Sequence, residues 1–226
     1  MVDPRSLILD PVVMQKIGVL GSATVGQTLA AGFKKHGYDV RIGSRTPAKL
    51  ADFSKSSGIP SGTFADVAAW ADGVVLAVSG KVAEDAVRSA GEGNLRGKLV
   101  IDATNPIGDG PPVDGVIQFF TGPNESLMER LQQAYPRVKF VKAFNSVGAP
   151  RMVNPSFADG KPTMFYCGND ADAKAFVATV LDQFGWEALD MGSAAAARAI
   201  EPLSQLWCIP GFRQNSWTHA FKVVWK

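Results

Sequence analysis

Short, continuous apolar runs alternate with amphipathic segments along most of this chain of 226 residues, and this alternation constrains the fold more than any other feature. The runs KIGVLG (16–21), GVVLAVS (73–79) and GKLVIDAT (97–104) place Val, Ile and Leu at consecutive positions, which is typical of strands covered on both faces. VGQTLAAGFKKHG (25–37) and VAEDAVRSA (82–90) between them favour helices. The pattern predicts an α/β fold, a Rossmann-type doubly wound, mostly parallel sheet.

Two stretches interrupt the alternation. Residues 105–124 are rich in Gly, Pro and Asp, and residues 145–162 are also irregular, so we expect long loops that serve function or move. From Ser193 onward an Ala-rich helix and an aromatic tail follow. We therefore expect an N-terminal arm over 1–15, a Rossmann domain over 16–192 and a small C-terminal helical part over 193–226.

Composition excludes several classes of protein. The formal net charge is +2, with 19% charged and 46% hydrophobic residues, so we expect a globular chain without a nucleic-acid interface. The apolar runs are too short to span a membrane, and no signal peptide is evident, so we expect a cytoplasmic protein. Cys167 and Cys208 lie far apart with no redox spacing, and no His/Cys/Glu cluster has metal spacing, so we expect no metal.

The turn after the first apolar run has the layout of a dinucleotide-binding motif. It reads Gly21-Ser22-Ala23-Thr24-Val25-Gly26. Glycine at the first position permits the tight turn, and glycine at the last lets the following helix pack close to the strand. Ala23 replaces the usual middle glycine and adds one methyl group beside the expected pyrophosphate, which backbone N–H groups and the helix dipole would hold.

The end of the second strand indicates which nucleotide binds. An NAD site usually has a carboxylate there for the ribose 2′-hydroxyl. This chain has Ser44 and Arg45, with Lys49 one helical turn later. A hydroxyl, a guanidinium and an ammonium would bind a 2′-phosphate. We therefore expect NADP(H) as the cofactor.

Several motifs, in order along the chain, resemble one known family. They are IGVLGSATVGQTLAAGF, VRIGSRTPAK, GVVLAV, VIDATNP, VKAFNSVGA and FYCGNDADAKAFVATVLDQFGWEALDMG. They resemble the NADPH:deazaflavin oxidoreductases, which act on coenzyme F-420, and the reductase domain of the STEAP metalloreductases. HAFKVV (219–224) is similar to the family's final helix.

The resemblance implies site residues, a second substrate and a homodimer. Ser44, Arg45 and Lys49 match the residues that hold the 2′-phosphate. The nicotinamide ribose would border Ala77, Val78 and Ser79. We also expect Asn105 to contact the cofactor. The carboxamide and the deazaflavin would lie against Asn145, Val147 and Ala149. Archaeal members have a histidine in place of Asn145 and a proline–aromatic pair in place of Ser79-Gly80.

The chain offers few groups for acid–base chemistry. Lys142, in VKAFN, is the best candidate for such a role, and it is otherwise a solvent-facing or carboxylate-paired lysine. A flavin-type acceptor needs no such group, because its ring nitrogen can exchange a proton with water and the protein then supplies orientation.

Four aromatic side chains in the C-terminal part could stack on an aromatic ligand, or else cover the core or form a dimer interface; they are Trp207, Phe212, Trp217 and Phe221. The spacing of Arg198 and Glu201 favours a local ion pair.

Three functions fit these features. The first is an NADPH-dependent oxidoreductase that transfers a hydride to or from a deazaflavin such as F-420 or a flavin. The second is a non-catalytic NADP(H) sensor. The third is an NADPH-dependent reductase of a small carbonyl or imine compound, for which Lys142 would be the proton donor.

Overall fold

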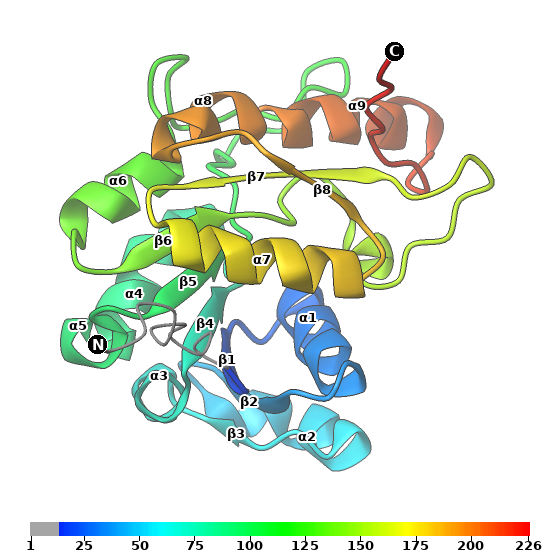
Figure 1. Cartoon of the computed structure of the whole chain (residues 1–226). Helices are drawn as coiled ribbons and strands as arrows, with labels where there is room; N and C mark the ends of the chain where they lie inside the picture. The colour runs from blue at the N-terminus through cyan, green and yellow to red at the C-terminus, as the bar shows by residue number, and fades with distance from the viewer. Residues whose placement is uncertain (1–13) are drawn as a thin grey trace, which may run out of the picture.

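The computed structural model describes residues 14–226, and one sheet of eight strands organises them (Figure 1). The strands are β1 (Lys16–Leu20), β2 (Asp39–Gly43), β3 (Ser61–Gly62), β4 (Gly73–Leu76), β5 (Leu99–Asp102), β6 (Lys139–Lys142), β7 (Thr163–Gly168) and β8 (Glu187–Asp190). Their order in the sheet is β3-β2-β1-β4-β5-β6-β7-β8. Neighbouring strands are parallel except β6 and β7, which are antiparallel. The predicted Rossmann-type, mostly parallel sheet is confirmed.

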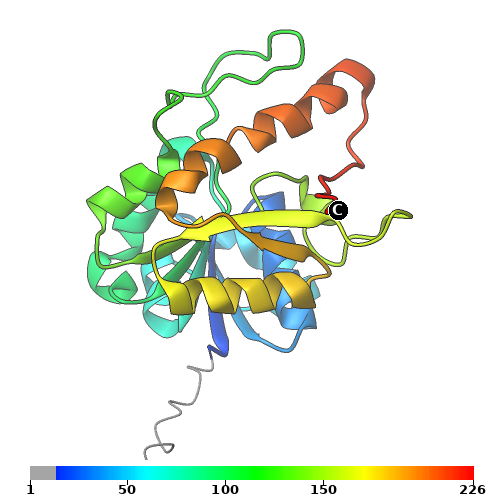
Figure 2. The ribbon, with the colours of Figure 1, turned by 45° about the horizontal axis from the view of Figure 1, so that its top comes forward.

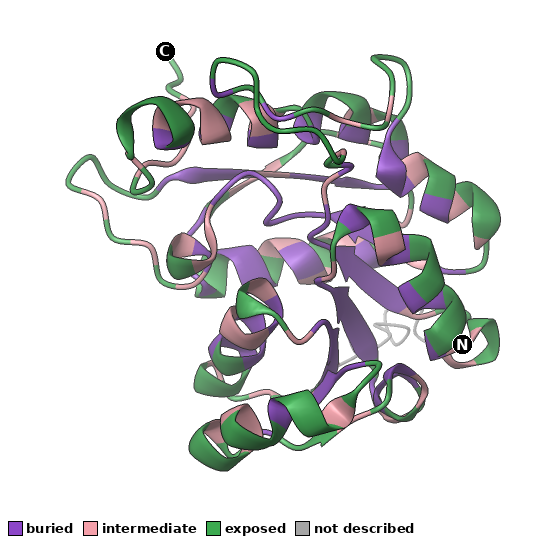
Figure 3. Cartoon of the chain, turned by 180° about the vertical axis from the view of Figure 1, so that it is seen from behind, coloured by how far each residue is buried: buried purple, intermediate pink, exposed green. Residues whose placement is uncertain are grey.

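Helices cover both faces of this sheet. They are α1 (Thr24–Lys35), α2 (Ala51–Ser57), α3 (Phe64–Trp70), α4 (Ala83–Ala90), α5 (Glu92–Leu95), α6 (Leu127–Ala134), α7 (Ala171–Gln183), α8 (Ala197–Ile200) and α9 (Leu203–Gln214), with 3-10 turns at Pro47–Leu50, Gly80–Val82, Ala149–Arg151 and Ala194–Ala196. α1 and α7 pack into one apolar cluster with the sheet, whereas α3, α4 and α6 pack into another. Figure 3 shows the strands buried between helices whose outer faces are exposed.

Local signals in the sequence start and stop these helices. Thr63 and Asp66 form a capping box at the start of α3, Ser126 caps α6 and Asp170 caps α7. α1 ends at His36, and Gly37 follows with a φ of +88° that favours glycine.

The two long irregular stretches are loops, as expected. Residues 105–124 leave β5 and approach α9, where Gln205 Nε2 donates to Ile117 O at 2.8 Å (Figure 2). Within this loop, isolated bridges join Ile107 to Phe119 and Val113 to Val116.

The end of the chain differs from expectation. Residues 219–224 were expected to form a final helix, but they have no regular structure. Asn215 adopts a left-handed conformation that ends α9, and the chain then returns to the start of β7, where Thr163 N donates to Phe221 O at 2.8 Å. Most of the expected N-terminal arm lies outside the described residues, and the domain division at residue 193 stays a prediction.

Candidate functional site

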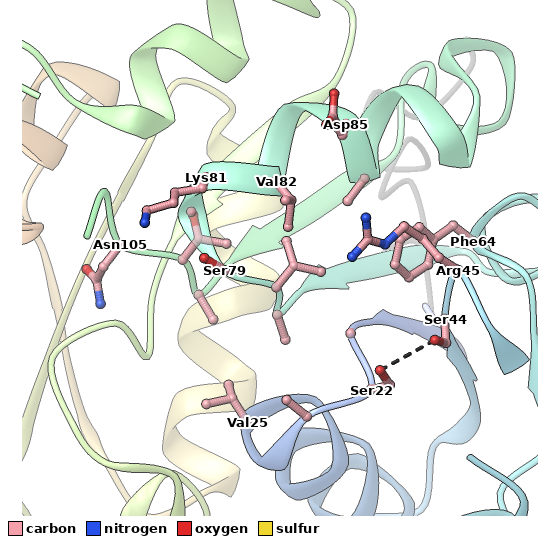
Figure 4. Close-up of a pocket in the computed structure, with 18 of the residues that line it drawn as sticks. Ser22, Val25, Ser44, Arg45, Phe64, Ser79, Lys81, Val82, Asp85 and Asn105 are labelled. Atoms are coloured by element: carbon pink, nitrogen blue, oxygen red, sulfur yellow. Dashed lines mark hydrogen bonds between the residues drawn. The ribbon is translucent and has the colours of Figure 1, made fainter. Parts of the chain in front are cut away.

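A cavity of about 600 Å³ follows the carboxyl ends of four neighbouring strands (Figure 4). In sheet order, its lining comes from residues 44–49 after β2, 21–25 after β1, 77–82 after β4 and 103–108 after β5. β1 and β4 are parallel neighbours, but the strands that follow β1 in sequence are added on one side of it, and those from β4 onward on the other. Doubly wound folds bind ligands where the strand order reverses in this way. The four segments therefore form one elongated site at the expected edge.

The turn between β1 and α1 brings backbone close to this cavity. Gly21 has a φ of +145°, and a Cβ atom there would lie 2.1 Å from Ala77 O. A Cβ on Gly26 would lie 2.0 Å from Gly21 O, so both end glycines of the motif are sterically required. Ala23 is the N-cap of α1, and no described side chain caps this helix or places a carboxylate in its first turn. The start of α1 therefore offers N–H groups and a positive dipole end to an anion.

Basic and hydroxyl side chains occupy the β2 end of the cavity. Ser44 is buried, and its hydroxyl accepts from Thr46 N at 3.1 Å and donates to Ser22 Oγ at 3.4 Å. Arg45 and Lys49 are exposed lining residues. Figure 4 shows the Arg45 side chain extending across the cavity mouth. This end can bind a dianion through charge-assisted hydrogen bonds.

The β5 end of the cavity has different chemistry. Ser79 and Asn105 line it, and Gly80 packs so closely that an added Cβ would lie 2.0 Å from Asn105 O. Lys81 also lines the cavity and pairs with Asp109 of the 105–124 loop. Neutral hydrogen-bonding groups and one paired lysine therefore surround this end.

The Asn145 segment lies behind the cavity wall rather than on it. Asn145 is 4% exposed, and its amide donates to Asn105 Oδ1 at 3.1 Å and to Ile200 O at 3.0 Å. Asn105 Nδ2 donates back to Asn145 O at 2.8 Å. Val147 is buried and Ala149 half-buried, and neither lines the cavity. Asn105 lines the cavity and is bonded to Asn145 behind it, so direct contact of this segment with a ligand stays a prediction.

Lys142 is not placed for proton transfer. Its side chain is fully buried, with Nζ 2.7 Å from Asp102 Oδ2 and 2.8 Å from Glu201 Oε1, and it does not line the cavity. Burial lowers the pKa of Lys142, but Asp102 and Glu201 outweigh this effect and raise the pKa above its ordinary value. Of the roles weighed for Lys142, the structure shows the carboxylate-paired lysine. The expectation that Lys142 is a proton donor in the cleft is wrong, because its ammonium is buried between Asp102 and Glu201.

The expected ion pair between Arg198 and Glu201 is also wrong. Arg198 points to Glu129 of α6, with Nη2 2.7 Å from Glu129 Oε1. Glu201 turns inward to Lys142. The spacing permitted a local pair, but a buried ammonium requires carboxylates more strongly than an exposed guanidinium does.

Trp207, Phe212 and Trp217 of the C-terminal part pack against one another and against His219. Trp207 packs on His219 with ring centroids 5.1 Å apart and on Trp217 at 5.6 Å. Phe212 meets Trp217 edge-on at 5.2 Å. These residues do not line the cavity, so the hydrophobic cover weighed above fits their position better than a ligand stack.

Several lining residues were not singled out from the sequence: Thr46, Phe64, Gly80, Lys81, Val82, Asp85, Ala86, Ala103, Thr104, Ile107 and Gly108. Ala103 and Thr104 directly follow β5, so the rule that ligands bind at strand carboxyl ends could have found them. Thr24 and Gly26 shape the turn without lining the cavity.

Neither thiol is set up for reaction. Burial raises the pKa of the Cys167 thiol to about 12 and also raises that of Cys208. Within residues 14–226, no group of three His, Cys, Asp or Glu side chains could hold a metal ion. In the same part of the chain, no helix has the length and apolar character needed to cross a membrane.

The chain is similar to known proteins of the two groups that its sequence motifs resemble. Residues 16–106 match the family described as "NADP oxidoreductase coenzyme F420-dependent". A crystal structure from Arthrobacter sp. FB24, provisionally named an F420-dependent NADP-reductase, is 35% identical with a TM-score of 0.87, over 93% of this chain and 99% of that one. Metalloreductase STEAP3 of Rattus norvegicus is 30% identical over 86% of this chain, and human metalloreductase STEAP2 is 28% identical over 83%.

The chain spans 38% of the length of the STEAP3 relative and 35% of the STEAP2 relative. The likeness to the Arthrobacter protein, by contrast, covers nearly all of both chains. The family resemblance inferred from the sequence motifs is thereby confirmed. This chain belongs to the coenzyme F420-dependent NADP oxidoreductase family.

Proposed function

We propose that this protein binds NADPH along the whole cavity and exchanges its hydride with a deazaflavin such as coenzyme F-420, or with a flavin. The observation that carries the proposal is the order of the lining segments. A basic end after β2, a helix N-terminus after β1 and an amide-lined end after β5 follow one another in a cavity of about 600 Å³. This order suits a 2′-phosphate, a pyrophosphate and a carboxamide in turn.

The residues present fit such a ligand. Ser44, Arg45 and Lys49 would hold the 2′-phosphate. The Gly21 turn leaves no room for a side chain, so backbone N–H groups at the start of α1 can approach the pyrophosphate. Ala77, Val78, Ser79 and Asn105 line the far end, where the nicotinamide and its ribose would lie.

The lining also bears on the second substrate. When bound, NADPH supplies a hydride at its nicotinamide ring. Among the described residues, no histidine or tyrosine lines the cavity, and Lys142 is buried elsewhere. Lys81 does line the cavity, but its ammonium is paired with Asp109. Reduction of a carbonyl requires a proton donor within hydrogen-bond reach, whereas a flavin-type ring can exchange its proton with water. The chain's own contribution is then to bind both ring systems, orient them and exclude water between them.

A direct assay tests this function. Purified protein is mixed with NADPH and, separately, with coenzyme F-420, with flavin mononucleotide and with a cyclic imine, and NADPH oxidation is followed by absorbance. We expect turnover with one of the first two acceptors and not with the imine. Tight NADPH binding without oxidation by any acceptor would favour the sensor, and turnover with the imine alone would favour the third function.

We also propose that the protein is a homodimer. Exposed apolar side chains on α9 and on the loop beside it support this, among them Leu206, Phe212, Val113 and Val116. Such side chains are typical of an interface that the single chain leaves uncovered. Light scattering after size-exclusion chromatography would show a mass of about twice the 24.0 kDa of one chain, and a single-chain mass would contradict the proposal.

A further inference from the structure

A buried charge cluster lies beside the β5 end of the cavity. It consists of Asp102, Lys142 and Glu201, whose exposed fractions are 0%, 0% and 1%. Asp102 and Lys142 are the last residues of β5 and β6 and face each other in register. Glu201 comes from the junction of α8 and α9, so the cluster joins the sheet to the C-terminal part.

One side of this cluster holds a residue of the cavity wall. Asp102 Oδ1 accepts from Thr104 N at 2.9 Å and from Thr104 Oγ1 at 2.7 Å. Lys142 Nζ donates to Thr104 O at 2.9 Å. Thr104 lines the cavity, and the cluster binds its N–H, its hydroxyl and its carbonyl. The direction in which the chain leaves β5 toward Asn105 is therefore fixed by the cluster.

The other side is anchored in α6 and the C-terminal part. Glu201 Oε2 accepts from Leu127 N at 2.9 Å, and Oε1 accepts from Met128 N at 3.0 Å. The positive end of α6 thus offsets the second carboxylate, since two acids share one ammonium. Ile200, directly before Glu201, accepts from the Asn145 amide that holds Asn105. Ile200 therefore contacts Asn105 through Asn145, and Glu201 contacts Thr104 through Lys142.

Stability alone does not account for such a cluster. A buried ion pair contributes little net stability compared with apolar side chains of the same volume, because its desolvation cost offsets the attraction. The hydrogen bonds that the two carboxylates accept from Thr104, Leu127 and Met128 do select one geometry for these groups. Next to it, Phe144 adopts a φ of +65° although it is fully buried, and bulky residues accept such strain where the surroundings over-determine the backbone.

From these contacts we infer that Asp102, Lys142 and Glu201 are positioning residues that hold Thr104 and Asn105 in place for the nicotinamide half of NADPH. The inference rests on the proposed function for the identity and direction of the ligand. It assigns the C-terminal part a role in the site although none of its residues lines the cavity.

Two variants and one control separate positioning from general stability. Glu201→Gln and Asp102→Asn each keep the side-chain shape but present an amide NH₂ where a carboxylate oxygen now accepts. Arg198→Met is the matched control, because the Arg198–Glu129 pair joins the same C-terminal part to α6 without touching Thr104 or Asn105. Urea unfolding first establishes that each variant is folded.

The readout is the affinity for NADPH divided by the affinity for adenosine 2′,5′-bisphosphate, which has only the adenine end. We expect this ratio to fall about tenfold in Glu201→Gln and Asp102→Asn, the effect of misplacing one or two hydrogen bonds. The ratio should stay unchanged in Arg198→Met. With an acceptor that the wild type reduces, kcat should also fall roughly tenfold or more in the first two variants, because misaligned reactants lose rate steeply.

The outcomes distinguish this inference from the proposed function. A wild type that binds NADPH but reduces neither coenzyme F-420 nor flavin mononucleotide contradicts the function, and the affinity ratio still decides the positioning role. An unchanged ratio in the two variants overturns the inference, as does an equal fall in the Arg198→Met control. In an enzyme that turns over, an unchanged kcat in both variants overturns it too.

Discussion

Replacing Lys142 by methionine tests whether this lysine is a structural partner of buried carboxylates. The substitution nearly conserves volume, so cavity formation contributes little. It removes three contacts of the ammonium, at 2.7 Å to Asp102, 2.8 Å to Glu201 and 2.9 Å to Thr104 O. Removing one partner of a buried pair leaves uncompensated charge and costs about 3–5 kcal/mol, a large part of the roughly 5–15 kcal/mol by which a domain is stable.

Urea unfolding, followed by tryptophan fluorescence, to which the buried Trp186 contributes, measures this loss of stability. With a slope of about 1–3 kcal/mol per molar urea, the midpoint should fall by roughly 1–5 M. Lys98→Met is the matched control, because the half-buried Lys98 ammonium binds only carbonyls at the end of α3, and water can replace it at a cost of about 1 kcal/mol.

The pH dependence of this loss has a definite sign. The pKa of Lys142 is raised in the folded protein above its ordinary value of 10.5, so its contribution to stability is fully present below pH 10.5 and is lost only as the pH rises through the folded pKa. Lys142 itself should therefore add no pH dependence to the stability of the wild type between neutral pH and about pH 9. Adding Asp102→Asn and Glu201→Gln to Lys142→Met should restore part of the stability, because neutral amides leave no unpaired charge. A loss no larger than that of Lys98→Met would refute the reasoning.

Three further predictions concern the ligand site. Ser44→Asp with Arg45→Ala should weaken NADPH binding by about one to two decades and favour NADH, since charge-assisted hydrogen bonds are worth ~1.5–3 kcal/mol each; unchanged NADPH affinity in a titration would contradict the 2′-phosphate assignment. Ala23→Gly should keep or improve NADPH affinity, whereas Ala23→Val should weaken it, because a branched side chain at the N-cap of α1 fills space needed by the phosphates; tight binding by the valine variant would mean that the ligand takes another path. Gly148→Val should slow hydride transfer while adenosine 2′,5′-bisphosphate still binds, because a Cβ there lies 2.7 Å from the Trp207 ring and would shift the loop whose Asn145 bonds Asn105 of the cavity wall; full turnover would mean that this loop does not position the wall.

The sequence was sufficient to place Gly21, Ser44 and Arg45 beside one cavity, because this part of the chain is built from local signals. A strand, a glycine turn and a helix follow one another within residues 16–35, and Ser44 and Arg45 come directly after β2. Backbone sterics at Gly21 and the strand-end position of Ser44 do not depend on distant parts of the chain. The order of strand, glycine turn and helix therefore placed these residues at the edge where the cavity lies.

The far end of the site could not be predicted in this way, because distant segments determine it. Glu201 reaches Leu127 across 74 positions and Asn145 reaches Ile200 across 55, and no periodicity encodes such contacts. Local spacing instead suggested a pair between Arg198 and Glu201, which would have been exposed and of little energetic consequence. Once β5 and β6 bring Asp102 and Lys142 into register, a buried ammonium and carboxylate need further partners. Glu201 meets that need, and the C-terminal part is thereby held against the wall of the cavity.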